Sequence, residues 1–179
     1  MTAKLRSSDA AGSLAAPAAR LVHPIPPVCG ADARILILGS FPSVKSRETG
    51  FFYGHPQNRF WRVLGSVFDE AVPESVPERR AFLLAHRIAL WDVIHSCEIT
   101  GSSDASIRNA VANDIRALLE GAPIRAIFVN GRAAENLYRK YTEPVCGRPC
   151  RVLPSTSPAN AAWSLDRLIE AWHMIREIE

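Results

Sequence analysis

The chain lacks the features that mark membrane, secreted and metal-binding proteins. No apolar run in its 179 residues approaches the ~20 residues of a membrane span. The N-terminal stretch carries basic side chains but no continuous apolar segment, so a secretory signal is not expected. Only four cysteines occur, and their spacing matches neither a paired CxxC zinc site nor a disulfide framework. These absences favour a cytoplasmic protein that needs no metal.

One set of soft ligands stays open as an alternative. Cys146 and Cys150, together with His95 and Cys97, offer four nitrogen and sulfur ligands in principle. Scattered reduced cysteines are far commoner in cytosolic proteins, so we expect neither a metal nor a cofactor.

Two catalytic motifs are also missing. There is no GxxxxGK[ST], so the glycine that follows the first apolar run does not open a nucleotide-phosphate loop. There is no GxSxG and no Ser-His-Asp arrangement of firm spacing, which removes the usual signs of a serine hydrolase.

Size and charge are those of one ordinary domain with an uneven charge distribution. The hydrophobic content of 47% suits a single globular unit, which we expect over residues 23–179 after a disordered leader at 1–22. Residues 34–62 hold five basic side chains against one acidic side chain. This basic stretch favours an anionic partner such as nucleic acid, with a solvated basic face as the alternative.

Apolar runs alternate with helical patterns along the chain. The runs predict strands at 35–38, 88–94, 126–130 and 151–153. The helical patterns predict helices at 58–68, 79–87, 107–121, 131–141 and 164–178, with a long polar loop at 96–106. Because the strand cores are continuously apolar, we expect an α/β fold, a three-layer α/β/α arrangement with a central, mainly parallel four-stranded sheet.

Polar segments follow all four predicted strands. These segments are GSFPS at 39–43, WDVIHSCEITGSSD at 91–104, NGRAA at 130–134 and PSTSPAN at 154–160. The carboxyl ends of parallel strands meet at one edge of a sheet, where ligands bind. The sequence therefore predicts that the four segments form one site.

The first connection, residues 39–61, carries six aromatic side chains beside Arg and Lys. Such a mixture suits a pocket that stacks a flat base, although core packing is expected for Phe60 and Trp61. His55 is a candidate general acid or hydrogen-bond donor, with a structural role as the alternative. Asp92, at the end of a strand, is placed to read ring N–H groups or to act as a cap or ion-pair partner.

The last connection offers hydroxyls just before a helix. Ser and Thr hydroxyls with helix-terminal amides suit phosphate oxygens, and Pro158 with Ala159 makes a small apolar tip that suits a minor groove. The alternative is an elaborate N-cap in which Ser157 or Asn160 caps the last helix.

The run GSFPSVKSRETGFFYGHPQNRFWRVL resembles the signature of the uracil-DNA glycosylase superfamily, with its G-x-x-P opening and its T-G-F-x-[FY]-x-H-P-x-N-R-F-W. FVNGRAAE and LPSTSPAN continue the likeness, which covers about residues 24–175. The GSFP opening and the WDV…SCE…GSSD block resemble the hypoxanthine-DNA glycosylase branch. The resemblance implies an enzyme that flips a deaminated base, hypoxanthine in this branch, out of DNA and hydrolyses its N-glycosidic bond without a metal or cofactor.

The resemblance also implies roles for residues of the first loop. Phe41 stands where the mismatch-specific branch has its water-positioning Asn, so that role passes to Asn58, as in the hypoxanthine branch. The alternative is that Asn58 only caps the following helix. Tyr53 matches the base-stacking aromatic, and Asp92 lies where relatives read the base edge. Ser40 and Phe41 complete the expected base pocket.

The DNA-gripping residues implied by the resemblance lie mainly in the last loop. Ser155, Thr156, Ser157 and Asn160 would hold phosphates, and Pro158 with Ala159 would be the wedge, although Ala159 is small for that purpose. Lys45 would contact phosphate, with Schiff-base lyase chemistry as the alternative. We expect a monofunctional glycosylase that acts as a monomer on DNA. The rival functions are a uracil/thymine mismatch glycosylase and a non-catalytic module that binds damaged DNA.

Overall fold

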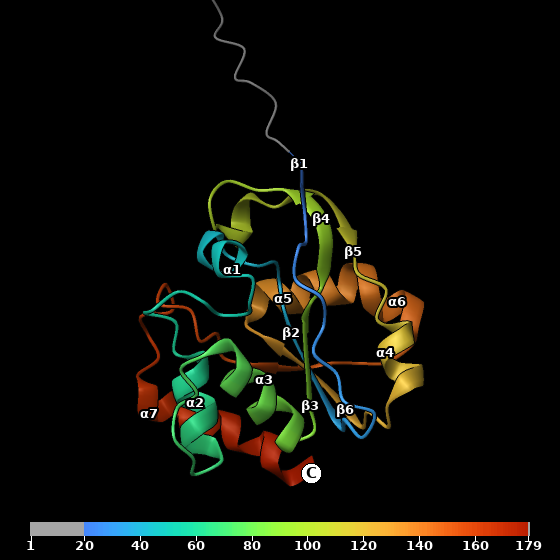
Figure 1. Cartoon of the computed structure of the whole chain (residues 1–179). Helices are drawn as coiled ribbons and strands as arrows, with labels where there is room; N and C mark the ends of the chain where they lie inside the picture. The colour runs from blue at the N-terminus through green and yellow to red at the C-terminus, as the bar shows by residue number, and fades with distance from the viewer. Residues whose placement is uncertain (1–19, 179) are drawn as a thin grey trace, which may run out of the picture.

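A parallel four-stranded sheet forms the centre of the computed structural model, which describes residues 20–178 (Figure 1). Its strands lie in the order β3-β2-β6-β7 and are β2 (Ile35–Gly39), β3 (Ile88–Asp92), β6 (Ala126–Asn130) and β7 (Arg151–Leu153). All five residues of β2 are buried, which fits the continuous apolar runs that predicted strands covered on both faces. The predicted fold class is confirmed.

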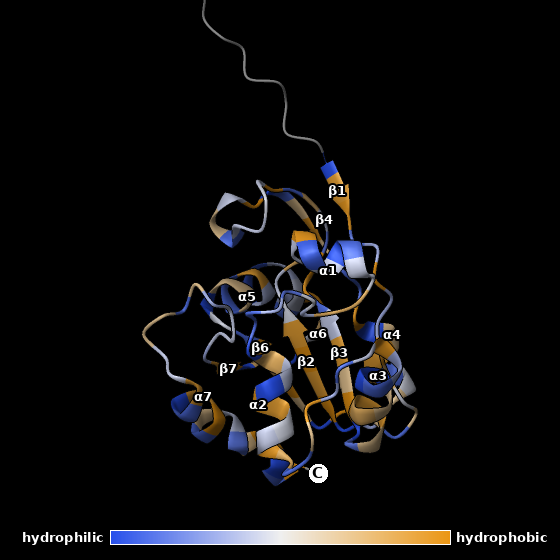
Figure 2. Cartoon of the chain, turned by 60° about the vertical axis from the view of Figure 1, so that its left-hand side comes forward, coloured by the Kyte–Doolittle hydropathy of each residue, from blue (hydrophilic) through white to orange (hydrophobic). Residues whose placement is uncertain are grey.

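Alternate residues of β2 enter two different cores. Ile35 and Ile37 pack with the helices α2 (Phe60–Val67), α3 (Val76–Ala85) and α7 (Leu165–Trp172). Leu36 and Leu38 face the opposite core, which is covered by α4 (Arg116–Gly121), α5 (Arg132–Leu137) and α6 (Glu143–Cys146). Figure 2 shows the hydrophobic strands lying between these helices.

A second, antiparallel sheet was not predicted. It has the order β1-β4-β5 and is built from β1 (Arg20–Val22), β4 (Ile94–Glu98) and β5 (Arg108–Ala112). The 3-10 turn η1 (Asp104–Ser106) lies in the connection from β4 to β5. Figure 1 shows this sheet at the end of the molecule next to α1 (Val44–Thr49).

The helix predicted over 107–121 is therefore wrong in its first half. Pairing with β4 makes residues 108–112 a strand, and only 116–121 are helical. Asn113 separates the two parts, because its side-chain amide donates to the carbonyl oxygens of Asp92 (2.9 Å) and Ile94 (3.2 Å). These bonds hold the chain on the strand beside it, so tertiary contacts overrode the local helical pattern.

Other boundaries differ in smaller ways. The first long connection contains a helix, α1, which is capped by Ser43. The strand predicted over 88–94 ends at Asp92, and β4 begins at Ile94. The helix after β6 continues as a π-helical turn, η2 (Tyr138–Thr142), and the last helix as a 3-10 turn, η3 (His173–Ile178). The leader expected at 1–22 lies outside the described residues up to 19, and residues 20–22 form β1.

Residues 20–178 contain neither a membrane-spanning helix nor a cluster of metal ligands. None of the helices within 20–178 is long and apolar enough to cross a membrane. Within the same residues, no group of three or more His, Cys, Asp or Glu side chains is arranged to hold a metal ion.

Candidate active site

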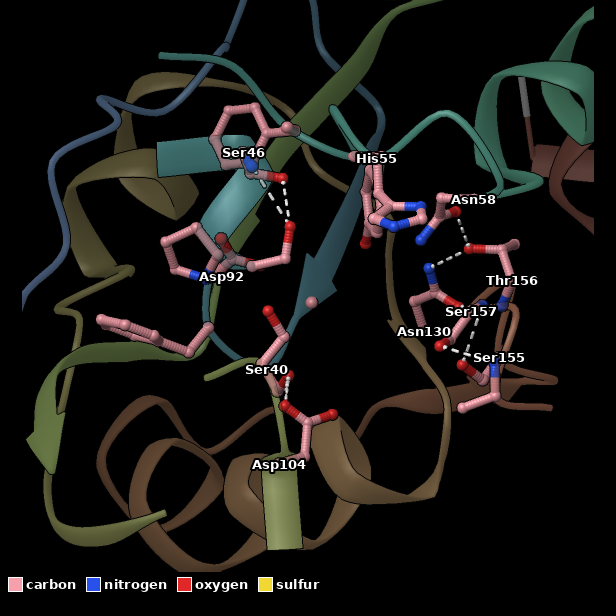
Figure 3. Close-up of a pocket in the computed structure, with 18 of the residues that line it drawn as sticks. Ser40, Ser46, His55, Asn58, Asp92, Asp104, Asn130, Ser155, Thr156 and Ser157 are labelled. Carbon is pink, nitrogen blue, oxygen red and sulfur yellow. Dashed lines mark hydrogen bonds between the residues drawn. The ribbon is translucent and has the colours of Figure 1, made fainter. Parts of the chain in front are cut away.

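A cavity of about 370 Å³ opens at the carboxyl edge of the parallel sheet. Residues that follow all four strands line it, and the β4–β5 connection adds a further wall (Figure 3). The expected convergence of the four polar segments is therefore observed. The lining residues from the strand ends are Gly39, Asp92, Asn130 and Ser155.

Neutral amides and a hydroxyl form one side of the cavity, which we call the amide side (Asn58, Asn130 and Thr156). The Thr156 hydroxyl donates to Asn58 Oδ1 (2.9 Å) and accepts from Asn130 Nδ2 (2.9 Å). Asn130 Oδ1 in turn accepts from the Thr156 backbone N–H (3.0 Å). These bonds fix the orientation of both amides, because the oxygen of each amide faces a hydrogen-bond donor. Thr156 is fully buried and so acts inside the wall.

Asn58 bonds to the start of the following helix, and its side chain also lines the cavity. Its Oδ1 accepts from the backbone N–H of Phe60 (3.0 Å) at the start of α2, in addition to the bond from Thr156. A carbonyl oxygen has two lone pairs, and both are occupied here. Among the described residues no partner binds Asn58 Nδ2, and the side chain lines the cavity. The NH₂ group is therefore the part of Asn58 that a ligand can use.

Arg59 ties the first loop to the last one. Its guanidinium donates to the backbone carbonyl oxygens of Ser157 (2.6 Å), Asn160 (3.1 Å), Thr156 (3.3 Å) and Trp163. Five N–H groups in a rigid fork can satisfy several carbonyls at once, which a Lys ammonium does less well. Sequence reasoning did not single out this residue, because its partners lie about a hundred positions away.

Carboxylates form the other side, which we call the carboxylate side (Asp92 and Asp104). His23 Nε2 lies 2.8 Å from Asp92 Oδ2, and both side chains are almost completely buried. His23 Nδ1 accepts from the backbone N–H of Ile25 (3.2 Å), so the neutral ring carries its proton on Nε2 and donates it to Asp92. His23 thereby fixes the carboxylate that was predicted to read a base edge.

Asp104 reaches the cavity from η1 and was not predicted as a site residue. Its Oδ1 accepts from the Ser40 hydroxyl (2.6 Å). Desolvation raises the pKa of the Asp104 carboxyl, the negative charge of Asp92 raises it further, and the Ser40 hydrogen bond opposes the shift. The residue as a whole is exposed at the rim. Nothing in the local sequence marks it, because only the β4–β5 hairpin brings it to the cavity.

Tyr53 lies between the two sides, in the left-handed region at φ 53°. Its ring stacks on Phe60 with a centroid distance of 3.8 Å and also lines the cavity. Its buried hydroxyl has no hydrogen-bond partner among the described residues. Burial, then the charge of Asp92, raises the Tyr53 pKa; the nearby Asn130 side chain opposes the shift without reaching hydrogen-bond geometry.

Gly39 leaves the room that this arrangement needs. A Cβ atom at this position would lie 2.2 Å from Asp92 Oδ1 and 3.1 Å from the Tyr53 hydroxyl. The floor of the cavity is therefore bare backbone, against which the carboxylate and the phenol both pack.

The remaining predicted residues of the first loop have different positions. Phe41 is buried, lines the cavity and meets the His23 ring edge-to-face at 5.8 Å. His55 is exposed at the rim, where its Nδ1 accepts from the Gln57 backbone N–H (3.1 Å). Lys45 lies on α1, is paired with Glu48 at 3.0 Å, and is not part of the cavity lining.

The last loop forms the rim next to the amide side. Pro158 and Ala159 are exposed at its tip. The hydroxyl of Ser155 accepts from the Ser157 N–H (3.2 Å), and the hydroxyl of Ser157 accepts from the Ala159 N–H (3.2 Å). Each hydroxyl keeps its own O–H to donate. The Asn160 side-chain amide instead donates to the backbone carbonyl oxygen of Ser155 (2.9 Å), within the same loop.

Fold and site together describe an α/β domain with a cavity that carboxyls, amides and aromatic rings line at the carboxyl edge of its parallel sheet. Comparison with protein families then gives the particular group: the model of the Uracil DNA glycosylase superfamily matches residues 26–176. The chain belongs to this superfamily, as its first-loop signature predicted.

Individual relatives agree with this assignment. The chain is 37% identical over 155 residues to a protein of Methanosarcina acetivorans named hypoxanthine DNA glycosylase, covering 84% of this chain and 94% of the relative. A Methanosarcina barkeri protein of the same name is 34% identical over 140 residues, covering 75% and 85%. The solution NMR structure of a candidate uracil DNA glycosylase from M. acetivorans superposes with a TM-score of 0.73 at 35% identity, covering 86% of this chain and 96% of that one.

Proposed function

We propose that this protein is a monofunctional DNA glycosylase that releases hypoxanthine from deoxyinosine in DNA. The observation that carries the proposal is the Asp92 carboxylate, which His23 holds at the floor of a cavity lined by Tyr53. Two relatives that bear the name hypoxanthine DNA glycosylase support the same substrate. The cavity of about 370 Å³ falls within the size range of pockets that enclose small ligands.

A fixed carboxylate selects hypoxanthine over the adenine from which it forms. Hypoxanthine carries a proton on N1, which donates to Asp92, whereas adenine presents a lone pair at N1. The lone pair of adenine would face a buried negative charge, so the undamaged base is rejected electrostatically. Since His23 already occupies Asp92 Oδ2, the base would use Oδ1.

The flipped base would stack on Tyr53 and bring its sugar toward the amide side. The glycosidic bond breaks through an oxocarbenium-like state, which a positioned but weakly nucleophilic water can capture. Because the Asn58 carbonyl is already occupied, the Asn58 NH₂ group would hold the water by donating to its oxygen. One water lone pair then remains to attack C1′.

The rim residues suit the DNA backbone. The Ser155 and Ser157 hydroxyls would donate to phosphates flanking the flipped nucleotide, and Pro158 with Ala159 would enter the space that the base leaves. Lys45, which lies outside the cavity, would meet phosphate rather than the sugar. A cytoplasmic monomer remains our prediction for its location and assembly.

Uracil is the second candidate substrate, because its N3–H also donates to a carboxylate. The deciding experiment measures base release from short duplexes that hold one deoxyinosine, one deoxyuridine or only normal bases. We expect hypoxanthine release by the wild type and none from the normal duplex. Release of uracil alone would make uracil the substrate. Tight binding without release of either base would show a non-catalytic module that binds damaged DNA.

A further inference from the structure

Asp92 and Asp104, the two carboxyls that line the cavity, differ in exposure, because Asp92 is buried and Asp104 lies exposed at the rim. Asp92 receives an N–H from a buried histidine, whereas the hydrogen bond to the Asp104 carboxyl comes from the neutral hydroxyl of Ser40. Figure 3 shows the Ser40–Asp104 pair and the amide network on different sides of the pocket. The two acids of one cavity therefore have different surroundings, an arrangement that often separates their chemical roles.

A departing purine can be neutralised by protonation at N7, an atom that a pyrimidine does not have. When the C1′–N9 bond breaks, its electron pair moves into the purine ring, and protonation at N7 converts the departing anion into a neutral base. A positioned acid that gives this proton typically accelerates such a step by about 10²–10⁴-fold. Uracil instead leaves with its negative charge spread onto its carbonyl oxygens, which hydrogen-bond donors can stabilise.

We propose that Asp104 is the general acid that protonates N7 of the flipped hypoxanthine. This inference rests on the proposed function. With N1–H on Asp92, the N7 edge of the base turns toward another wall, and Asp104 is the acid that lines the cavity from the β4–β5 connection. The Ser40 hydroxyl would keep one carboxyl oxygen in place while the other holds the proton.

The atoms of the step balance. Asp104 gives its proton to N7 as the C1′–N9 bond breaks, so the base leaves neutral and the sugar carries the positive charge. The water on Asn58 adds to C1′, and its surplus proton returns to the Asp104 carboxylate directly or through solvent. The enzyme regains its starting protonation state.

The pKa of the Asp104 carboxyl lies above its ordinary value, although the Ser40 hydrogen bond opposes the shift. Desolvation is the largest cause of the raised pKa, and the charge of Asp92 acts in the same direction. The Asp104 charge also raises the pKa values of Tyr53 and Cys97, and the charges of Arg20 and Arg47 act on Cys97 in the opposite sense. A base that fills the cavity would displace water and strengthen the effect.

The test compares Asp104→Asn with the wild type in single-turnover release of hypoxanthine between about pH 5 and pH 9. Asn is isosteric and can still accept the Ser40 hydrogen bond, so the fold is expected to persist. We expect a loss of about 10²-fold in rate. Affinity for a duplex with non-hydrolysable 2′-fluoro-deoxyinosine should change little. Asp114→Asn, an exposed acid paired with Arg116, is the matched control that keeps wild-type rates.

The pH profile separates an acid from other roles of Asp104. If Asp104 is a general acid, the wild-type rate falls as pH rises through the pKa of Asp104. In Asp104→Asn this decline of the rate with rising pH should be absent. Ser40→Ala removes a hydrogen bond that lowers the pKa of Asp104. In this variant the decline of the rate should therefore occur at higher pH than in the wild type.

Three outcomes overturn the assignment. An unchanged rate in Asp104→Asn excludes the acid, and a wild-type rate lost only as pH falls would require the carboxylate form instead. An equal loss of affinity for the fluorinated duplex would make Asp104 a binding residue. If the wild type releases no hypoxanthine, the proposed function itself fails, which differs from release that does not depend on Asp104.

Discussion

The two sides of the cavity differ in how firmly they are held. On the amide side, Asn58, Asn130 and Thr156 are joined by direct hydrogen bonds, and the Arg59 guanidinium clamps the loop behind them. On the carboxylate side, the hydrogen bonds to the carboxyls of Asp92 and Asp104 come from one side chain each. Hydrogen bonds that join several side chains restrain the orientation of each of them. We infer that the amide side fixes the reacting geometry and the carboxylate side tunes recognition and proton transfer.

The largest loss of activity is expected when a negative charge is placed on the amide side. Asn58→Asp keeps an acceptor for Phe60 and Thr156 but replaces the NH₂ group by a second oxygen. If the NH₂ group positions the water, hypoxanthine release should fall by about 10²–10³-fold, as on loss of one oriented donor.

Single-turnover rates of Asn58→Asp and Asn58→Ala make the comparison sharp. Similar losses in both variants support the donor role. Wild-type activity in Asn58→Asp would instead show that an oxygen at this position activates the water.

The next largest effect is expected when the hydrogen bonds from the Arg59 guanidinium to the last loop are weakened. Arg59→Lys keeps the positive charge but leaves several carbonyls of the last loop without a donor. We expect the free energy of unfolding to fall by about 2–4 kcal/mol, measured by urea titration. Arg62→Lys, on the exposed face of α2, is the control and should change it by less than about 0.5 kcal/mol. Equal effects of the two substitutions would refute the clamp.

A smaller loss of activity is expected when the Asp92 carboxylate is displaced. Gly39→Ala places a methyl group where Asp92 Oδ1 lies, so the carboxylate must shift. We expect hypoxanthine release to fall by about tenfold, which corresponds to roughly 1.4 kcal/mol in the barrier. Gly121→Ala, where an added Cβ meets nothing within 4 Å, is the control. A wild-type rate in Gly39→Ala would mean that the position of Asp92 does not matter.

The smallest effect concerns the tyrosine between the two sides. Tyr53→Phe removes a buried hydroxyl without a partner, so the free energy of unfolding should rise by up to about 1 kcal/mol. Tyr138→Phe should lower it by about 1 kcal/mol, because that hydroxyl donates to the Arg148 carbonyl (2.8 Å). Urea titrations of both variants test the contrast, and a destabilised Tyr53→Phe would contradict it.

The raised pKa of Tyr53 adds a pH dependence with a defined sign. Its neutral form is favoured in the fold, so its contribution to stability is complete below the ordinary tyrosine pKa of 10.0 and is lost as pH rises above it. Stability measured between neutral pH and about pH 11 should therefore fall less steeply in Tyr53→Phe than in the wild type.

The parallel sheet and one half of the site were predictable from sequence. Continuous apolar runs indicate strands buried on both faces, and parallel strands bring the residues that follow them to one edge. Asp92 was found in this way, Asn58 and Tyr53 were found through the resemblance of the first loop, and all three line the cavity. Asn130 was missed although it ends a predicted strand, which was the signal available for it. Their catalytic and binding roles remain proposals.

The other half was not predictable because its signals are not local. Residues 107–112 match a helical pattern, and only pairing with β4 makes most of them a strand. That pairing is what carries Asp104 to the cavity. His23 comes from a Pro-rich segment that gave no sign of a partner 69 positions away.

The sequence by itself determined the parallel α/β sheet, the edge that carries the site and the superfamily signature, because these depend on local periodicity and contiguous motifs. The tertiary structure alone decided which lone pairs of Asn58 are occupied, which histidine holds Asp92 and which second acid lines the cavity. Those features depend on hydrogen bonds between segments far apart in the chain. A hydrogen bond forms only where donor and acceptor meet at about 3 Å with the right direction, and only the folded chain sets that geometry.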